Sequence, residues 1–467
     1  MVSLLNILNM AGQSLSVQQD ATAVAGQNLA NVNNPAYADE QLQIQSAPDL
    51  QTTIGQEGTG VTSTGITQLW NSLLNSQIVS EGSVSGSLTS QQSALQQAEA
   101  YLNEQLSSSS SSSSSPNGLA ADFSSYFGAL QTLSTDPSSI PDRQAVIQAA
   151  QQLTGQFNSV SSGLGTVTKD LNSSIQSDVT SANQDLSQIA NLNQQIVVAQ
   201  ANGGSANDLI DQREQTIEAL AGKVNLTTTP QADGAVDISI GGVTMVSGVT
   251  TPDSLGTYTD ANGNLQIKAQ TAGTDLTLTG GSIEGNITAR DGAITTLQSS
   301  LNSLASELVT QTNSVYQSGY DLNGNSNADF FSGNNAGNIA VNSTLTTSPQ
   351  SFQASGVSGD TGNNSVVLGL VQVSETSNAV LNGQTYSQYY AQTVGSFGSS
   401  LQSVNQQLAN STSVSQMLTN QRSSQTGVDT DTEMTNLMQF QKAYQASAEL
   451  ITTVNQMLET LISMKTE

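Results

Sequence analysis

Both ends of the chain carry an apolar seam with the spacing of an amphipathic helix. Residues from Leu4 to Val32 recur at alternating steps of four and three, and residues from Met434 to Ile462 repeat the pattern. Such spacing places the side chains on one stripe of each helix, and a stripe of this kind needs a partner helix to bury it. The two stripes can bury each other, which closes a domain, or bury the same surfaces of neighbouring molecules, which makes a polymer.

We expect the polymer, with ends that stay poorly ordered in the monomer and become helical when they pack against neighbours. The predicted polymerisation interface comprises the larger apolar members of the two seams: Leu4, Leu8, Leu15, Leu29, Val32, Met434, Leu437, Tyr444, Ile451, Leu458 and Ile462.

The runs that flank the seams resemble a known family. The first helix leads into a run from Asn28 to Tyr37, in which Pro35 pushes the residue before it out of the helical region. The last helix follows the run Val428–Met434 and contains the run Gln441–Ala448. These two runs resemble the terminal signatures of the bacterial flagellar axial proteins, the family of rod, hook and hook-associated proteins. The motif residues given by this resemblance are Asn28, Asn31, Asn34, Pro35, Tyr37, Gln441 and Gln445.

Interior segments narrow the resemblance to the members of this family that join hook to filament. The matching segments, in chain order, are Phe123–Ser134, Asp142–Gln144, Ala206–Glu214, Gly281–Gly285, Gly319–Gly324 and Phe330-Phe331. The resemblance implies a structural adaptor that assembles as a ring at the hook–filament junction; a hook or distal rod protein is the alternative. A run of nine serines, Ser107–Ser115, departs from the family and predicts an exposed loop at residues 107–118.

The resemblance also implies the partners and the location. The partners are further copies of the chain, the hook protein, a second junction protein on the filament side, and a cytoplasmic export chaperone at the C-terminal helix. The chain is then expected to be secreted by the flagellar type III export apparatus into the extracellular flagellum. The N-terminal segment lacks the positive region of a cleavable signal peptide, and no apolar run is long enough to span a bilayer.

Composition excludes several classes of function. Nine Lys and Arg stand against 36 Asp and Glu, a net charge of −27, which disfavours binding to nucleic acid and insertion into or attachment to anionic membranes. Cysteine and histidine are absent, which removes disulfides, thiolate nucleophiles, Cys/His zinc sites and the usual general base of hydrolytic triads. We therefore predict no enzyme, no catalytic residues, no cofactor and no metal.

Three sequence features that could suggest a binding or catalytic site have simpler structural explanations. The run Asp321–Asp329 resembles a calcium loop but lacks its glycine and its final glutamate, so a turn is expected. Asp429 precedes the last helix and is expected to cap it. Trp70, the single tryptophan, is expected in the core, which leaves no sugar platform and makes a polysaccharide hydrolase a poor second hypothesis. An adhesin that uses the β domain is the third.

The periodicity predicts a mainly α fold with an inserted β domain, in a nested order along the chain. Paired terminal coiled-coil helices come from residues 1–50 and 426–467, and a long helical bundle comes from residues 51–225 and 286–425. Residues 226–285 alternate with period two and predict a small β head, which we expect at the tip of the molecule. Residues 326–375 are expected to be irregular.

Overall fold

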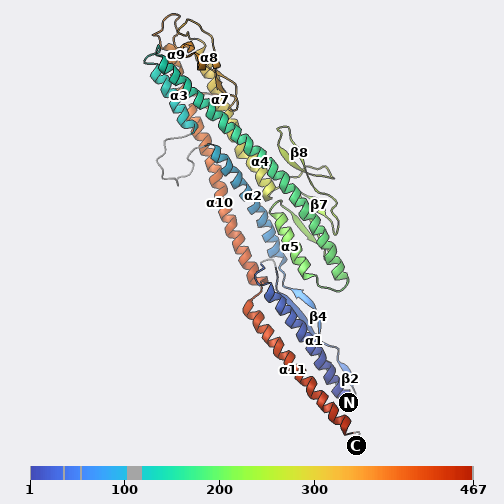
Figure 1. Cartoon of the computed structure of the whole chain (residues 1–467). Coiled ribbons are helices and arrows are strands. Elements are labelled where there is room, and N and C mark those ends of the chain that lie inside the picture. Colours follow the sequence, from blue (N-terminus) through green and yellow to red (C-terminus); the bar gives the residue numbers. More distant parts are fainter. Residues whose placement is uncertain (1, 35–36, 53–54, 103–117, 465–467) are drawn as a thin grey trace.

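The molecule is elongated, and both ends of the chain lie at the same end of it (Figure 1). The computed structural model describes residues 2–34, 37–52, 55–102 and 118–464. Pro35 and the serine tract of residues 107–115 lie outside the described residues, so the loop predicted there is not tested.

The terminal end is built from two helices and a hairpin. Helix α1 (Val2–Ala30) lies antiparallel beside α11 (Thr430–Ser463), and strands β1 (Glu40–Ser46) and β4 (Val61–Gln68) pack on α1 as an antiparallel pair (Figure 1). The short strands β2 and β3 continue this hairpin, over Leu50–Thr52 and Gly55–Glu57.

Four long helices form the shaft above it. They are α2 (Ser72–Leu102), α4 (Ile140–Ala201), α7 (Thr295–Tyr316) and α10 (Tyr386–Thr426). Apolar side chains recur at helical spacing through residues 141–200, and they belong to one helix: α4 spans 62 residues, about 90 Å at 1.5 Å per residue.

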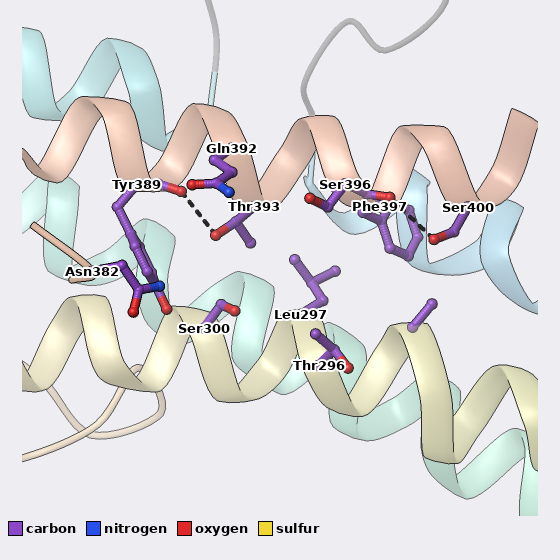
Figure 2. A pocket seen from close by; sticks show the side chains of 11 residues that line it. Thr296, Leu297, Ser300, Asn382, Tyr389, Gln392, Thr393, Ser396, Phe397 and Ser400 are labelled. Carbon is purple, nitrogen blue, oxygen red and sulfur yellow. Dashed lines mark hydrogen bonds between the residues drawn. The ribbon is translucent and has the colours of Figure 1, made fainter. Parts of the chain in front are cut away.

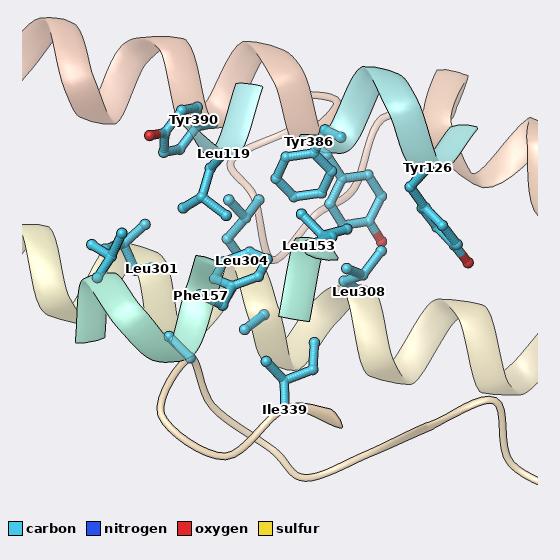
Figure 3. Close-up of a cluster of buried hydrophobic side chains, with 14 of the residues drawn as sticks. Leu119, Tyr126, Leu153, Phe157, Leu301, Leu304, Leu308, Ile339, Tyr386 and Tyr390 are labelled. Atoms are coloured by element: carbon cyan, nitrogen blue, oxygen red, sulfur yellow. The ribbon is translucent and has the colours of Figure 1, made fainter. Parts of the chain in front are cut away.

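The far end of the shaft holds a large apolar core. Side chains from α4, α7 and α10 meet there with Leu119 and Tyr126 of α3 and with Ile339 (Figure 3). Rings dominate this core: Phe330 packs edge-on against Phe331 at 4.6 Å between ring centroids. The smaller elements that close this end are α3 (Leu119–Leu133), β10 (Phe331–Ser332), β11 (Ala340–Val341), α8 (Ser343–Thr347), a 3-10 turn (Pro349–Ser351) and α9 (Ser365–Glu375).

Two expectations about this end are wrong. Residues 326–375 are not wholly irregular, because α9 buries Val366, Leu370 and Val373 at helical spacing. The β domain is also not at the tip: it lies beside the shaft, against the second half of α4 and near α5 (Asn207–Ala221) (Figure 1).

The β domain consists of a three-stranded sheet and a hairpin. Strands β5 (Thr227–Pro230), β6 (Val236–Ile240) and β7 (Val243–Val246) pair in that order, and β8 (Leu255–Thr259) pairs with β9 (Leu265–Ala269). Amides of α4 hold both parts. The Asn193 side chain donates to the carbonyls of Val236 and Gly248, at 2.8 and 2.7 Å, and the Asn183 side chain donates to the Leu255 carbonyl at 2.8 Å. The predicted fold class, mainly α with a small β domain, is confirmed; the structure is 64% helical.

The chain returns from the β domain to the shaft through a close helix contact and a π-helical turn. Helix α6 (Gly281–Ala289) crosses α2 so closely that a methyl group at Gly285 would lie 2.2 Å from the Ser87 carbonyl oxygen. The π turn Arg290–Ile294 joins α6 to α7.

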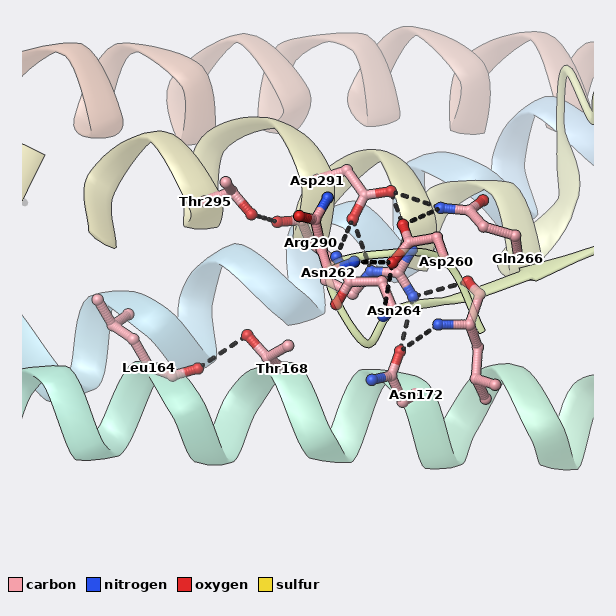
Figure 4. Close-up of polar contacts among 11 residues, drawn as sticks. Leu164, Thr168, Asn172, Asp260, Asn262, Asn264, Gln266, Arg290, Asp291 and Thr295 are labelled. Carbon is pink, nitrogen blue, oxygen red and sulfur yellow. Dashed lines mark hydrogen bonds and ion pairs between the residues drawn. The ribbon is translucent and has the colours of Figure 1, made fainter. Parts of the chain in front are cut away.

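Arg290 is fully buried at the start of this turn and bonds in three directions (Figure 4). It forms a bidentate pair with Asp291, at 2.7 and 2.9 Å, and donates to Asn172 Oδ1 of α4 at 2.6 Å and to the Leu265 carbonyl of β9 at 2.9 Å. One guanidinium thus joins the helix return, the shaft and the β hairpin.

We predict that Arg290→Met lowers the free energy of unfolding by about 3 kcal/mol, because it removes the guanidinium donors to the part-buried Asn172 of α4 and Leu265 carbonyl of β9 and breaks the ion pair with Asp291. Urea unfolding followed by circular dichroism measures the loss. Lys169→Met removes an exposed cation from the middle of α4 and is the matched control. An equal small effect of both substitutions would show that Arg290 does not hold the β hairpin to the shaft.

Candidate functional site: the paired terminal helices and their elbow

The terminal helices bury one stripe of each against the other within a single chain. Ser14 Oγ lies 3.2 Å from Ser447 Oγ, and Asn28 lies beside Glu433, so the antiparallel register is constant along the pair. The expectation that the two ends have no partner before assembly is therefore wrong. The pair is a closed unit along one seam.

On α11, every second position of the buried seam is shifted by one residue from the predicted seam. On α11 the side facing α1 includes the predicted Leu437, Ile451 and Leu458, but between them it uses Phe440 and Val454. Apolar residues spaced by alternating steps of four and three can belong to either of two neighbouring stripes on the helix. The two stripes share every second residue, and the partner helix determines which stripe is buried.

On α1 the buried face is wider than a two-helix seam, because the β1–β4 hairpin covers its other side. The most buried residues there are Ala11, Val17, Ala21, Val24 and Ala25. Leu4, Leu8, Leu15, Leu29 and Val32 of the predicted interface are partly exposed on the flanks of this face. Met434, Tyr444 and Ile462 of α11 are exposed.

Beyond the buried seam, α11 keeps apolar side chains in solvent. Met457 is 51% exposed and Leu461 is 47% exposed, and Leu450 and Met464 continue their flank at helical spacing. Met438 is also exposed, on the side of α11 that faces away from α1. The pair therefore buries one seam and leaves further apolar surface of α11 exposed.

The motif residue Asn28 joins the terminal helices to the turn that follows α1. Its amide, 1% exposed, donates to Asp39 Oδ1 at 2.7 Å, to the Glu40 carbonyl at 2.9 Å and to Glu433 Oε2 at 3.3 Å. Its oxygen accepts from the Tyr37 hydroxyl at 2.8 Å and from the Glu40 backbone N–H at 3.1 Å. An aspartate could not make the donor contacts, so this position needs an amide.

The other motif residues divide into two groups. Tyr37 is buried beside Asn28, and Asn31 and Asn34 shape the turn, since the Asn34 N–H donates to the Asn31 carbonyl at 2.8 Å. Gln441 and Gln445 are exposed on α11 and take no part in the pair. The structure thus brings the N-terminal motif residues together and separates them from the two glutamines.

The terminal helices join the shaft at a region of few contacts, which we call the elbow; it includes Asp39, Gln68, Asp211 and Thr426. The Asp39 N–H donates to the Thr426 carbonyl at 2.8 Å, and the Gln68 side chain donates to Asp211 Oδ1 of α5 at 2.5 Å. Burial is the main cause that raises the pKa of Asp211 to about 7; the carboxylates of Glu40 and Asp208 contribute to this rise, and the hydrogen bond from Gln68 opposes it. Burial and the same acids also raise the pKa of the Tyr37 hydroxyl.

Sequence reasoning missed Asp211 as an elbow residue, and it placed Trp70 wrongly. Trp70 is 45% exposed at the elbow, ahead of α2, and not in the core. Two other expectations are confirmed: the turn at Asp321 and the helix cap at Asp429. Asp321 Oδ1 accepts the N–H groups of Asn323 and Asn325, both at 2.8 Å, in a turn, and Asp429 caps α11 by accepting from the Thr432 N–H at 2.8 Å.

No metal site or membrane helix is found in residues 2–34, 37–52, 55–102 and 118–464. Within these ranges no three acidic side chains are placed to hold a metal ion. The helices of the same ranges are too short or too polar to cross a membrane.

We predict that Asp211→Asn removes a pH-dependent loss of stability. Because the folded pKa lies above the unfolded value of 3.8, the neutral carboxyl is fully tolerated below pH 4, and this stability is lost as the pH rises through 7. The variant should match the wild type near pH 4 and exceed it at pH 8 by about 2–4 kcal/mol. Chemical unfolding at both pH values checks this, with the exposed Asp170→Asn as control. A variant no more stable than wild type at pH 8 would contradict the assignment.

Two known families match parts of the chain. The family described as the flagellar hook-associated protein FlgK helical domain matches residues 104–331. The family described as the flagellar basal body rod FlgEFG protein C-terminal matches residues 419–464, which include α11.

Whole-chain relatives carry one name. Flagellar hook-associated protein 1 of Bacillus subtilis (strain 168) is 26% identical over 98% of this chain and 97% of its own length, and that of Escherichia coli (strain K12) is 23% identical over 98% and 100%. The Salmonella typhimurium protein is 27% identical over 70% of this chain and 59% of its own. The solved flagellar hook junction protein FlgK from Burkholderia pseudomallei is 25% identical, with a TM-score of 0.48 over 55% of this chain and 46% of that chain. By the two family matches and the full-length relatives, this chain is similar along its whole length to flagellar hook-associated protein 1, a structural component of the bacterial flagellum.

Proposed function

We propose that the chain is an adaptor that assembles as a ring at the hook–filament junction and is held there by its terminal helix pair. The observation that carries this proposal is the apolar surface that remains on α11 after α11 has paired with α1. Exposed apolar stripes on a soluble chain mark surfaces that another molecule covers. The domain division at residues 1–50 and 426–467, 51–225 and 286–425, and 226–285 belongs to this proposal, with the first domain as the polymerising one.

The neighbours of the ring follow from its place between two tubes. The hook protein lies on one side and a second junction protein on the filament side, with further copies of the chain beside it. The acidic, cysteine-free composition suits an exported extracellular protein that relies on packing and not on disulfides. Assembly by neutral and apolar surfaces, without a reaction, agrees with the absence of histidine and cysteine from the chain.

We predict that Met457→Asp prevents assembly but leaves the monomer intact. Met457 is exposed in the single chain, so an aspartate there costs the monomer little, whereas in an assembled wall it would be an unpaired buried charge. Cells that carry the variant should lose motility, and the purified variant should melt within a few degrees of the wild type.

Val454→Asp is the matched comparison, because Val454 is 3% exposed and faces α1. It should lower the melting temperature of the monomer as well as motility. Normal motility with Met457→Asp would show that the exposed flank of α11 is not covered in the assembly.

A helix with apolar flanks is an aggregation hazard before export, so we expect a small helical chaperone to cover residues 425–467 in the cytoplasm. It should co-purify with the full chain and not with a chain that ends at residue 424. Equal recovery with both chains would rule out this binding site.

A further inference from the structure

Helix α10 is the one long helix among the described residues that carries no acidic side chain. The sequence holds 36 Asp and Glu among 467 residues, yet none occurs between Glu375 and Asp429. Helix α10 lies wholly in this interval, and its single charged side chain is Arg422, which pairs with Glu218 of α5 near the elbow. By contrast α4, on the other side of the shaft, carries Asp170 and three more aspartates.

Helix α10 runs along the outer edge of the shaft, from the far end to the elbow (Figure 1). It buries Phe397, Leu401, Val404 and Leu418 toward the shaft. The residues on its opposite side recur at steps of four and three, and all are exposed and uncharged: Gln402, Gln406, Ala409, Ser413, Gln416 and Asn420. We call these six residues the outer stripe of α10. The stripe has the spacing of a helix-packing seam but is made of uncharged residues, which are polar except for Ala409.

A groove on a different side of α10, along residues 389–400, is also neutral. It lies between α7 and α10, has a volume of about 340 Å³, and none of its lining side chains is charged (Figure 2). Leu297 and Phe397 are buried at its base, and Tyr389, Ser396 and Ser300 line its sides.

Three hydroxyls of α10 are already hydrogen-bonded within the helix. Thr393 Oγ1 donates to the Tyr389 carbonyl at 2.9 Å, Ser400 Oγ to the Ser396 carbonyl at 3.1 Å, and Ser413 Oγ to the Ala409 carbonyl at 2.9 Å. Covering these three hydroxyls leaves their donors paired, so they add little to the desolvation cost of a contact on α10.

A chain with a net charge of −27 repels its own copies, and opposing acidic surfaces would cost several kcal/mol. Interface cores are depleted of charged side chains for this reason. We propose that the outer stripe of α10 is the lateral contact with a second copy of this chain. This inference rests on the ring assembly proposed above, and adds which face of the shaft the neighbouring copy covers.

Because the chain has no cysteine, one introduced thiol reports on the contact directly. Ser413→Cys places a thiol in the middle of the outer stripe, and Ser187→Cys places one at an exposed position of α4 as the matched control. Each variant is treated with a maleimide as purified full-length monomer and as intact flagella isolated from motile cells. We expect labelling at Ser413→Cys to fall about tenfold or more from monomer to flagella, and labelling at Ser187→Cys to fall much less.

A second comparison tests the charge argument. Gln402, Gln406 and Gln416 are changed together to Glu, which adds three charges without changing side-chain size; the control changes Gln148, Gln188 and Gln194, exposed on α4, in the same way. Both triples should fold as the wild type, and only the α10 triple should reduce motility, with partial recovery at higher salt.

Equal labelling of Ser413→Cys in monomer and flagella would overturn the α10 contact while leaving the junction adaptor intact, because the chain would still be present in the flagella. Equal effects of the two Glu triples would overturn it as well, since net charge and not the face would then decide assembly. Absence of the chain from isolated flagella would instead overturn the proposed function itself.

Discussion

The antiparallel pairing of α1 with α11 is the contact on which the rest of the architecture depends. It joins the two ends of a 467-residue chain, so everything between them must leave the terminal unit and return to it. The shaft is consequently built from helices that are distant in sequence, such as α2 beside α10, and the β domain enters as an excursion from α4 to α6. A nested chain of this kind closes its contacts late and over long loops, which favours strong local helices to offset the entropy of closure.

The terminal unit is attached to the shaft by polar contacts rather than by a shared apolar core. Among the described residues, one apolar cluster lies in the shaft and a second joins α4 and α5 to the β domain, and neither includes a residue of α1 or α11. Asp39 and Asp211 connect the parts instead, by hydrogen bonds to the Thr426 carbonyl and from the Gln68 side chain, whose geometry fixes an angle without much buried area. Such a joint holds orientation while costing little to rearrange, which suits a subunit that must fit between two differently built tubes.

The sequence predicted what periodicity controls and missed what tertiary contacts decide. The long helix α4 and the amphipathic helices at the two ends of the chain could be predicted, because their apolar residues recur at the spacing of a helix. The register of α11 could not be read, because Leu437, Ile451 and Leu458 belong to two overlapping stripes and α1 selects between them. The position of the β domain beside the shaft depends on Asn193 and on buried Arg290 in its π turn, contacts across many residues that leave no local pattern. Trp70 was misplaced because apolar spacing alone does not reveal a helix that begins only at Ser72.

A strongly acidic chain can still assemble if its acidic residues lie away from the surfaces that contact other copies. Self-repulsion at −27 keeps free copies apart, which protects a chain whose terminal helices carry exposed apolar flanks. The same repulsion would oppose a ring if it acted evenly over the molecule. It does not, because α11 offers apolar flanks at one end and α10 offers an uncharged stripe along the shaft, while Asp170 and the other aspartates of α4 lie elsewhere. Copies can therefore approach closely in a few orientations, and the charge that prevents random association also selects the ordered one.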